Sequence, residues 1–283
     1  MDDPQMRDRD QKAPTVSIVI PVYNEEGSLL PLHRRIQTAM ANYASEYEIV
    51  LVNDGSTDQS TILLDALADD DERVKVVHFR RNFGQTAAMS AGIDFAEGDV
   101  IVTMDADLQN DPSDIPAMIQ KLEEGFDLIH GWRRQRQDKF LTRRLPSKLA
   151  NRLISRVTGL TIHDLGCTLK VMRRQIAKDL RLYGEMHRFI PILAHWQGAQ
   201  ISEVPTRHHA RQFGQTKYGL SRTFRVILDL ITVKYLIQYS NAPMRFFGGI
   251  GLGCSAFSLL TAFLVLAMKL ISGFDISGNP LLY

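Results

Sequence analysis

Short apolar runs rich in β-branched residues alternate with longer segments of helical pattern over the first half of the chain. This alternation predicts a doubly wound α/β domain with a largely parallel sheet, in which each helix crosses over from one strand to the next. In such sheets ligands bind beyond the carboxyl ends of the strands. We expect strands at 15–21, 47–54, 73–79, 99–107 and 126–131, and helices at 25–43, 57–68, 84–97 and 112–124.

Polar clusters follow four of the predicted strands at those ends. In chain order they are PVYNEE, NDGSTD, RRNFGQ and DADLQ. Each cluster alone is explained by a turn, because Asn, Asp, Gly and Ser cap helices and close loops. Four clusters on one rim instead predict a binding crevice. The sequence contains neither a G-x-G-x-x-G motif nor a Walker A loop, so this crevice is not built around a glycine-rich phosphate cradle.

The fourth cluster carries Asp105, Asp107 and Gln109 at alternate positions. In an extended chain, positions two apart point to the same side, so these three oxygens are predicted to converge on one point. Carboxylate and amide oxygens suit Mg²⁺ or Mn²⁺ rather than zinc, and the 8 histidines form no zinc motif. Mg²⁺ commonly completes its shell with substrate phosphates, so an incomplete protein site predicts a diphosphate ligand.

One strongly apolar segment, Phe246–Met268, carries no charge. As a helix it would extend about 34 Å, enough to cross a bilayer, and the alternative is a buried core helix. Only Lys269 follows the segment, whereas four basic residues precede it: Arg222, Arg225, Lys234 and Arg245. The positive-inside rule therefore predicts an inner-membrane protein whose large N-terminal part faces the cytoplasm. The 2 cysteines fit a reducing compartment, and the net charge of +1 gives no global bias toward nucleic acid.

These patterns divide the chain into four parts. Residues 1–14 form a polar tail that we expect to be disordered, and 15–219 form the α/β domain. Within that domain the basic segment 132–160 is expected to face the membrane, the alternative being a solvated helix packed on the domain. An amphipathic helix over 220–243 is expected to lie in the membrane interface, ahead of a membrane region at 244–283 that we expect to be cut short.

The ordered series SIVIPVYNEE, VNDGSTD, RNFGQTAAMSAG and DADLQNDP resembles family 2 glycosyltransferases with the GT-A fold. FGQTKYG and the apolar C-terminal segment narrow the resemblance to polyprenyl-phosphate glycosyltransferases. That group includes dolichyl-phosphate mannose synthases, bactoprenol glucosyltransferases and the lipid A aminoarabinose transferase. The resemblance implies a metal-dependent enzyme that moves a sugar, with inversion, from a nucleotide-diphosphate sugar to a membrane polyprenyl phosphate.

The resemblance also implies roles for individual residues. The metal, Mg²⁺ or Mn²⁺, would be held by Asp105, Asp107 and Gln109, and catalysis would depend on Asp107, Asp164, Arg211 and Lys217. The nucleotide sugar would contact Pro21, Tyr23, Glu25, Val52, Asp54, Asp105, Ala106, Asp107, Gln109, Arg133, Arg211 and Lys217. The acceptor lipid phosphate would lie near Arg133, Arg143, Arg144 and Lys148. Cationic side chains beside a leaving diphosphate make chemical sense.

Similarity in FIPILA and YGLSR favours a bacterial enzyme that uses undecaprenyl phosphate, rather than dolichyl phosphate, and a UDP-sugar rather than GDP-mannose. Related enzymes form tetramers, so we expect a homo-oligomer. One alternative is a processive membrane polysaccharide synthase, although its Gln-x-x-Arg-Trp motif is absent. A second is a haloacid-dehalogenase-like Mg²⁺-dependent phosphatase, which usually carries its aspartate pair on the first strand and Thr in place of Gln109. A third is a membrane-tethered sensor that binds a sugar nucleotide without turnover.

Overall fold

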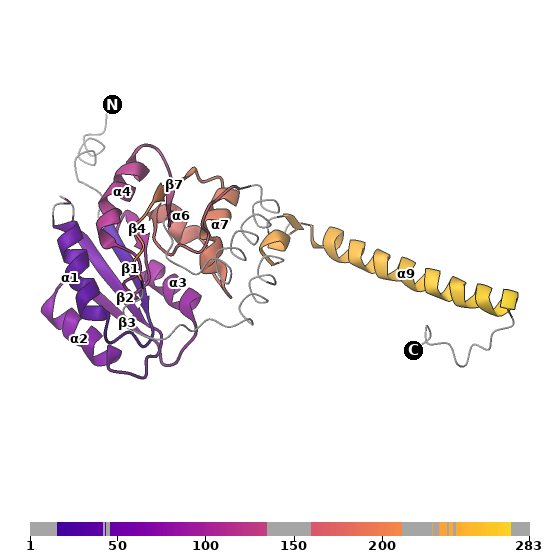
Figure 1. Ribbon diagram of the computed structural model, residues 1–283, viewed down its shortest axis with the longest axis horizontal. Coiled ribbons are helices and arrows are strands. Elements are labelled where there is room, and N and C mark those ends of the chain that lie inside the picture. The colour runs from indigo at the N-terminus through magenta and orange to yellow at the C-terminus, as the bar shows by residue number, and fades with distance from the viewer. Residues whose placement is uncertain are drawn as a thin grey trace, which may run out of the picture. The chain divides into compact units, whose positions relative to one another are not determined.

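The computed structural model describes residues 16–41, 43, 46–134, 160–210, 228, 232–236, 238–239 and 242–272. The chain divides between Leu230 and Ile231 into two compact units. The first unit is an α/β domain, and the second contains one long helix (Figure 1). The predicted tail 1–14 and residues 135–159 of the basic segment lie outside the described residues.

A seven-stranded sheet in the order β3-β2-β1-β4-β6-β5-β7 forms the centre of the first unit (Figure 1). Strands β1 to β4 are parallel to one another, and β5 is parallel to β7. Strand β6 runs antiparallel to both of its neighbours, β4 and β5. The strands are β1 (Val16–Val22), β2 (Tyr47–Asn53), β3 (Val74–His78), β4 (Val100–Thr103), β5 (Leu128–Trp132), β6 (Lys170–Arg173) and β7 (Ile201–Pro205). The sheet is therefore largely parallel, which confirms the predicted fold class.

Helices cover both faces of this sheet. One face carries α1 (Leu29–Met40), α2 (Ser60–Asp70), the 3-10 helix η2 (Pro112–Asp114) and α4 (Ile115–Glu123). The other carries α3 (Gln85–Phe95), α6 (Arg174–Asp179), the 3-10 helix η4 (Met186–Phe189) and α7 (Ile190–Trp196). Alternate residues of β1 separate the two layers, because Ile18 packs in the core with α1 whereas Val19 faces α3. At Gly92 of α3, a Cβ would lie 2.4 Å from Val19 Cγ1, so glycine allows this helix to approach the sheet.

The five strands and four helices predicted between residues 15 and 131 are present, with ends that differ by a few residues. The ends differ most in α1, which is shorter at both ends than predicted, and in β4, which ends at Thr103, before the aspartate pair. Two strands, β6 and β7, were not predicted. Strand β6 lies between β4 and β5 in the sheet although it follows both in the chain. A short segment that is buried on both sides has no amphipathic period by which to recognise it.

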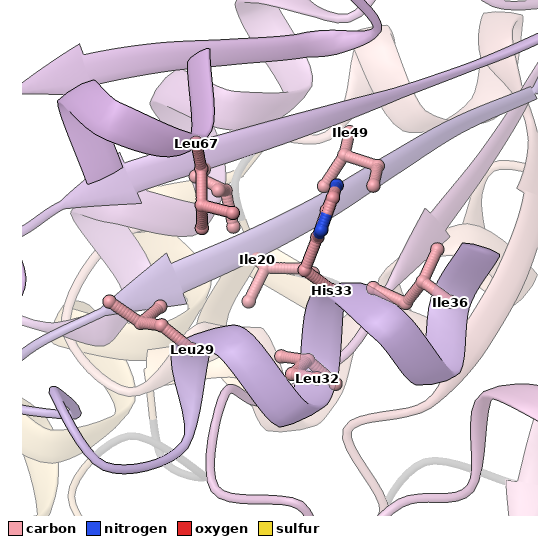
Figure 2. A pocket seen from close by; sticks show the side chains of 8 residues that line it. Ile20, Leu29, Leu32, His33, Ile36, Ile49 and Leu67 are labelled. Carbon is pink, nitrogen blue, oxygen red and sulfur yellow. The ribbon is translucent and has the colours of Figure 1, made fainter. Parts of the chain in front are cut away.

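A small hollow lies between α1, α2 and the first two strands (Figure 2). Its walls are apolar except for His33, whose Nε2 is 2.9 Å from Asp71 Oδ2. The lining residues are Ile20, Leu29, Leu32, His33, Ile36, Ile49, Leu51 and Leu67. Ligand sites combine apolar walls with several converging polar groups, whereas His33 is the single polar side chain among these lining residues. We therefore interpret the hollow as a packing gap in the core.

The second unit contains helix α9 (Pro243–Ser272), and its residues 243–271 are long and apolar enough to cross a membrane. It includes the whole of the predicted segment Phe246–Met268. Tyr235 packs its ring 5.4 Å from that of Phe246, which joins the helical residues 232–236 to the first turn of α9. Exposed apolar side chains along a helix of this length are suited to lipid rather than water.

A buried carboxylate stabilises the amino-terminal edge of the sheet. Glu48 accepts hydrogen bonds from Ser17 Oγ (2.5 Å) and from the backbone N–H of Glu97 (2.7 Å), and Lys75 Nζ lies 2.8 Å from its other oxygen. Burial tends to raise the pKa of Glu48, but the hydrogen bonds from Lys75, Ser17 and Glu97 outweigh it and hold that pKa below its usual value. The ionised form of Glu48 therefore stabilises the fold.

We predict that Glu48→Gln lowers the free energy of unfolding by about 2 kcal/mol at pH 7, because the variant loses charge-assisted hydrogen bonds. A lowered carboxyl pKa gives stability that is present above the unfolded pKa of about 4.3 and is lost as the pH falls through the folded pKa. The difference between the two proteins should therefore shrink in acid, as measured by urea unfolding at several pH values. Glu97→Gln is the matched control, since exposed Glu97 also pairs with Lys75, and it should cost less than about 0.5 kcal/mol. A difference that stays constant down to pH 3 would contradict this account.

Candidate functional site

The loops after β1 and β2 are joined to each other by hydrogen bonds. Asn24, which has a left-handed backbone (φ 54°), donates its N–H to Ser56 Oγ, and its side-chain oxygen accepts from the N–H of Thr57. The next residue, Glu25, donates its N–H to Ser60 Oγ. Tyr23 and Glu25, two of the predicted nucleotide contacts, therefore lie half-buried on a rim whose backbone is held from both sides, and Pro21 is buried at the end of β1.

The loop after β3 is shaped by the loop after β2. Asp54 is buried, and its two carboxylate oxygens accept the backbone N–H groups of Phe83 (2.7 Å) and Gly84 (2.9 Å). Gly55 has φ +66°, and a Cβ there would lie 2.4 Å from the carbonyl carbon of Arg81. Val52, the other residue predicted near the base and ribose, is fully buried beneath α3. The side chains of Val52 and Asp54 therefore shape the rim from within.

The segment after β4 leaves the extended conformation before it reaches the aspartate pair. Leu108, fully buried, adopts a left-handed backbone with φ 61°, and Asp107 Oδ1 accepts the N–H of Gln109 (3.1 Å). The stretch from Asp105 to Gln109 therefore bends rather than continuing as a strand, so alternation along a strand is not what orients these three side chains. A leucine in this conformation costs on the order of 1–3 kcal/mol and persists because surrounding packing determines it.

Asp105 lies at the inner end of this turn and is contacted from two other elements. Gln85 of α3 donates its amide Nε2–H to Asp105 Oδ1 (2.5 Å), and the Thr168 hydroxyl also hydrogen-bonds this carboxylate. Burial, and next the charge of Asp107, raise the pKa of Asp105 to about 7. A divalent cation bound beside the Asp105 carboxylate would stabilise its ionised form. Mg²⁺ needs only one or two protein carboxylates, so the donor set of Asp105, Asp107 and partly exposed Gln109 fits such an ion.

A nearly buried ion pair joins the end of β5 to the loop before β6. Arg133 contacts both oxygens of Asp164, with Nε–Oδ2 2.6 Å and Nη2–Oδ1 2.9 Å. The Asp164 carbonyl accepts the Nε2–H of His130, whose pKa falls to about 3, first because it is buried and next because Lys170 is near. At Gly166 a Cβ would lie 2.8 Å from Arg133 Nη2, so the glycine leaves space for the guanidinium.

The chain returns to the aspartate turn after β7. The N–H of His209 donates to the carbonyl of Gln109 (2.9 Å), and His208 forms an isolated antiparallel bridge with Asn110. Of the remaining predicted site residues, Ala106 is buried within the turn. Arg143, Arg144, Lys148, Arg211 and Lys217 lie outside the described residues.

Several polar residues at this site were missed by sequence reasoning. Gln85 and Thr168 contact Asp105, His130 supports Asp164, and Asn110 donates to Thr168 Oγ1. Fully buried Lys170 lies on β6 beside them. Gln85 and Asn110 belong to the clusters RRNFGQ and DADLQNDP, and the signal for residues beside β6 was HDLGCTLK, in which polar residues lead into an apolar run at the start of an unpredicted strand. Only Asp164 was selected from that stretch.

Comparisons with known proteins agree on the family. The model of the family described as "Glycosyl transferase family 2" matches residues 17–181. A dodecaprenyl-phosphate galacturonate synthase of Rhizobium johnstonii is 46% identical over 94% of this chain and 80% of its own length. An undecaprenyl-phosphate 4-deoxy-4-formamido-L-arabinose transferase of Shewanella sediminis is 40% identical over 91% of this chain and 76% of its own.

Among solved structures, glucosyl-3-phosphoglycerate synthase of Mycobacterium tuberculosis, crystallised with Mn²⁺ and UDP, aligns with a TM-score of 0.60 at 19% identity. The alignment covers 80% of each chain. At this identity the likeness concerns the fold alone.

The Arg133–Asp164 pair gives a stability prediction. Asp164→Ala removes both carboxylate contacts from the nearly buried guanidinium of Arg133, so the free energy of unfolding should fall by about 3–5 kcal/mol. The double variant Arg133→Met with Asp164→Leu should lose less than the single variant, because no unpaired charge remains. Denaturant unfolding followed by the fluorescence of neighbouring Trp132 measures both. Glu124→Ala in the exposed Lys121–Glu124 pair is the control and should cost less than about 1 kcal/mol. Equal costs for the two single variants would contradict the structural role assigned to the buried pair.

Proposed function

The chain belongs to glycosyl transferase family 2, and from this premise we propose that it transfers a sugar from a nucleotide-diphosphate donor to a polyprenyl phosphate in the membrane. The observation that carries the proposal is the Asp105–Asp107 pair at the carboxyl edge of the sheet, in a chain that also contains a membrane-length helix. The names of the rhizobial and Shewanella relatives support a polyprenyl phosphate as acceptor.

The proposed chemistry needs a site for departing negative charge. The bond between the anomeric carbon and the donor diphosphate breaks, while an oxygen of the lipid phosphate attacks from the opposite face, so the configuration inverts. Asp105, Asp107 and Gln109 would hold Mg²⁺ or Mn²⁺, which when bound supplies positive charge at the leaving diphosphate. We propose that Arg211 and Lys217 assist there. The lipid phosphate is ionised near neutral pH, so the protein needs no strong general base.

The rim residues divide into two groups in this proposal. Tyr23 and Glu25 line the donor side with Pro21 and Ala106, while Val52 and Asp54 maintain the shape of the loops around the nucleotide. Arg133 is the proposed anion contact, because a guanidinium offers several planar donors to a phosphate. Asp164 would then act by holding Arg133 in one orientation, since both of its carboxylate oxygens contact that side chain. Arg143, Arg144 and Lys148 remain proposed contacts of the lipid phosphate.

The membrane segment brings the enzyme to its acceptor. A polyprenyl chain resists leaving the bilayer, because each buried methylene contributes about 0.8 kcal/mol, so the catalytic unit must work at the membrane surface. We propose undecaprenyl phosphate as acceptor, a UDP-sugar as donor and a homotetramer as the assembly. The basic residues before α9 support a catalytic unit on the cytoplasmic side.

Product analysis tests the proposed function. The purified chain in detergent is given UDP- and GDP-linked sugars, undecaprenyl phosphate and Mg²⁺ or Mn²⁺, and lipid products are identified by mass spectrometry. One sugar on the lipid phosphate is the expected product. A polymer would instead support a processive synthase, which also contains a domain of this family. Donor hydrolysis with no sugar on any lipid would reject the proposed acceptor.

Asp107→Asn should reduce transfer by at least about 100-fold, because an electrostatic contact to the leaving group disappears. EDTA should abolish transfer by the unchanged chain, and added Mg²⁺ or Mn²⁺ should restore it. Radiolabelled sugar recovered in the lipid fraction measures both effects. Asp69→Asn, on the exposed surface of α2, is the matched control and should retain full activity. Robust transfer by Asp107→Asn in excess chelator would reject the metal site.

The orientation gives a separate prediction. In a Cys254→Ser background, a cysteine introduced at exposed Asp69 should react with a membrane-impermeant maleimide only after the inner membrane is opened. The remaining Cys167 is buried and should stay unlabelled while the protein is folded. Labelling of position 69 in intact spheroplasts would place the catalytic unit on the opposite side.

A further inference from the structure

Lys170 is a fully buried cation that the proposed chemistry does not use. Its side chain has no exposed surface, and its Nζ donates to the carbonyl oxygen of Cys167 at 2.7 Å. Among the described residues no carboxylate oxygen lies within 4.0 Å of this nitrogen, so no ion pair there offsets the cost of burying the charge. Unpaired buried charges are rare because losing their hydration costs free energy, so a retained one needs an explanation.

The sheet register places Lys170 beneath the aspartate turn. Lys170 pairs with Thr103 of β4 on one side and with His130 of β5 on the other. Asp105 follows Thr103 by two residues, and Thr168 precedes Lys170 by two residues. The Thr168 hydroxyl hydrogen-bonds the Asp105 carboxylate. Lys170 and Asp105 are near enough for each charge to shift the pKa of the other group. The Lys170 backbone lies at the start of β6, and its Nζ reaches the Cys167 carbonyl in the loop that precedes this strand.

The groups around Lys170 show the direction of its effect. Burial lowers the pKa of Lys170 to about 8, while Cys167, Asp105 and Asp164 act in the opposite direction and Arg133 lowers it further. The carboxylates of Asp105 and Asp164 favour the ammonium form of Lys170. A charge inside the domain is poorly screened by salt, so it acts through space on anions bound at the rim above it.

We propose that Lys170 is a positioning residue whose fixed charge, beneath Asp105, favours binding of the donor diphosphate and the growth of negative charge on it, without touching the substrate. This inference rests on the proposed function for the identity of the donor. It assigns a role to a residue that is inaccessible to ligand and therefore acts only by its field and through Asp105.

A purely structural role makes the opposite stability prediction. If Lys170 only ties down the Cys167 carbonyl, then Lys170→Met removes a hydrogen bond and destabilises the protein. If its charge serves ligand binding, the isosteric methionine removes a desolvated ammonium and leaves the protein at least as stable. Residues kept for function at the expense of stability show this combination of gained stability and lost activity.

The experiment measures nucleotide binding and thermal unfolding with the full chain in detergent. Lys170→Met should bind UDP about tenfold more weakly in the presence of EDTA, should bind uridine unchanged, and should melt at the wild-type temperature or above. The loss of UDP affinity should persist in 0.5 M NaCl, because a buried charge is weakly screened. Met172→Leu, on the same strand and face, changes no charge and should match the wild type in every measurement.

Three outcomes would overturn the inference, and a fourth separates it from the proposed acceptor. Wild-type affinity of Lys170→Met for UDP would overturn it. A lower melting temperature together with equal losses of affinity for UDP and for uridine would also overturn it. Lys170→Arg keeps the charge; if it folds, it should bind UDP more tightly than Lys170→Met, and equal binding would also overturn the inference. If Lys170→Met loses UDP affinity as expected but neither protein places sugar on a lipid, the inference stands and the proposed acceptor is rejected.

Discussion

The antiparallel insertion of β6 between β4 and β5 is the constraint on which the candidate site depends. It pairs Lys170 with Thr103 and His130, and so brings the 164–168 loop alongside the turn that carries the aspartate pair. Thr168 then reaches Asp105, and Asp164 meets Arg133 as it leaves β5. If β4 and β5 were paired directly with each other, these groups would have no shared edge.

Charge is distributed in two layers around this edge. Close to the rim, burial and the charge of Asp107 disfavour the ionised form of Asp105, which prepares the site for a cation and a diphosphate. Beside them at the end of β5, Arg133 and Asp164 pair with each other, and inside the sheet buried His130 is neutral and Lys170 has no ion-pair partner among the described residues. The groups inside the sheet therefore fix the geometry of the site and its electrostatic field. The carboxylates at the rim can then bind a cation and a diphosphate.

The rim itself is made of loops that shape one another. Asn24 ties the loop after β1 to the loop after β2, and Asp54 ties that loop to the one after β3. Gln85 and Thr86, the first residues of α3, extend these contacts to Asp105 and to buried His187 of η4. Because backbone N–H groups take part in most of these contacts, the rim keeps its shape independently of the surface side chains that a donor sugar would meet.

The sequence alone predicts the alternating strands and helices, the polar clusters after the first four strands, and the membrane-length segment. These are local properties, since periodicity, turn residues and apolar length are all visible within a short window. The contacts of Asp105 with Gln85 and Thr168, the pairing of Arg133 with Asp164 and the burial of Lys170 beside them are visible only in the folded structure. Those contacts depend on which strands become neighbours. An antiparallel strand that enters the sheet from a distant part of the chain leaves no local periodicity to predict its place.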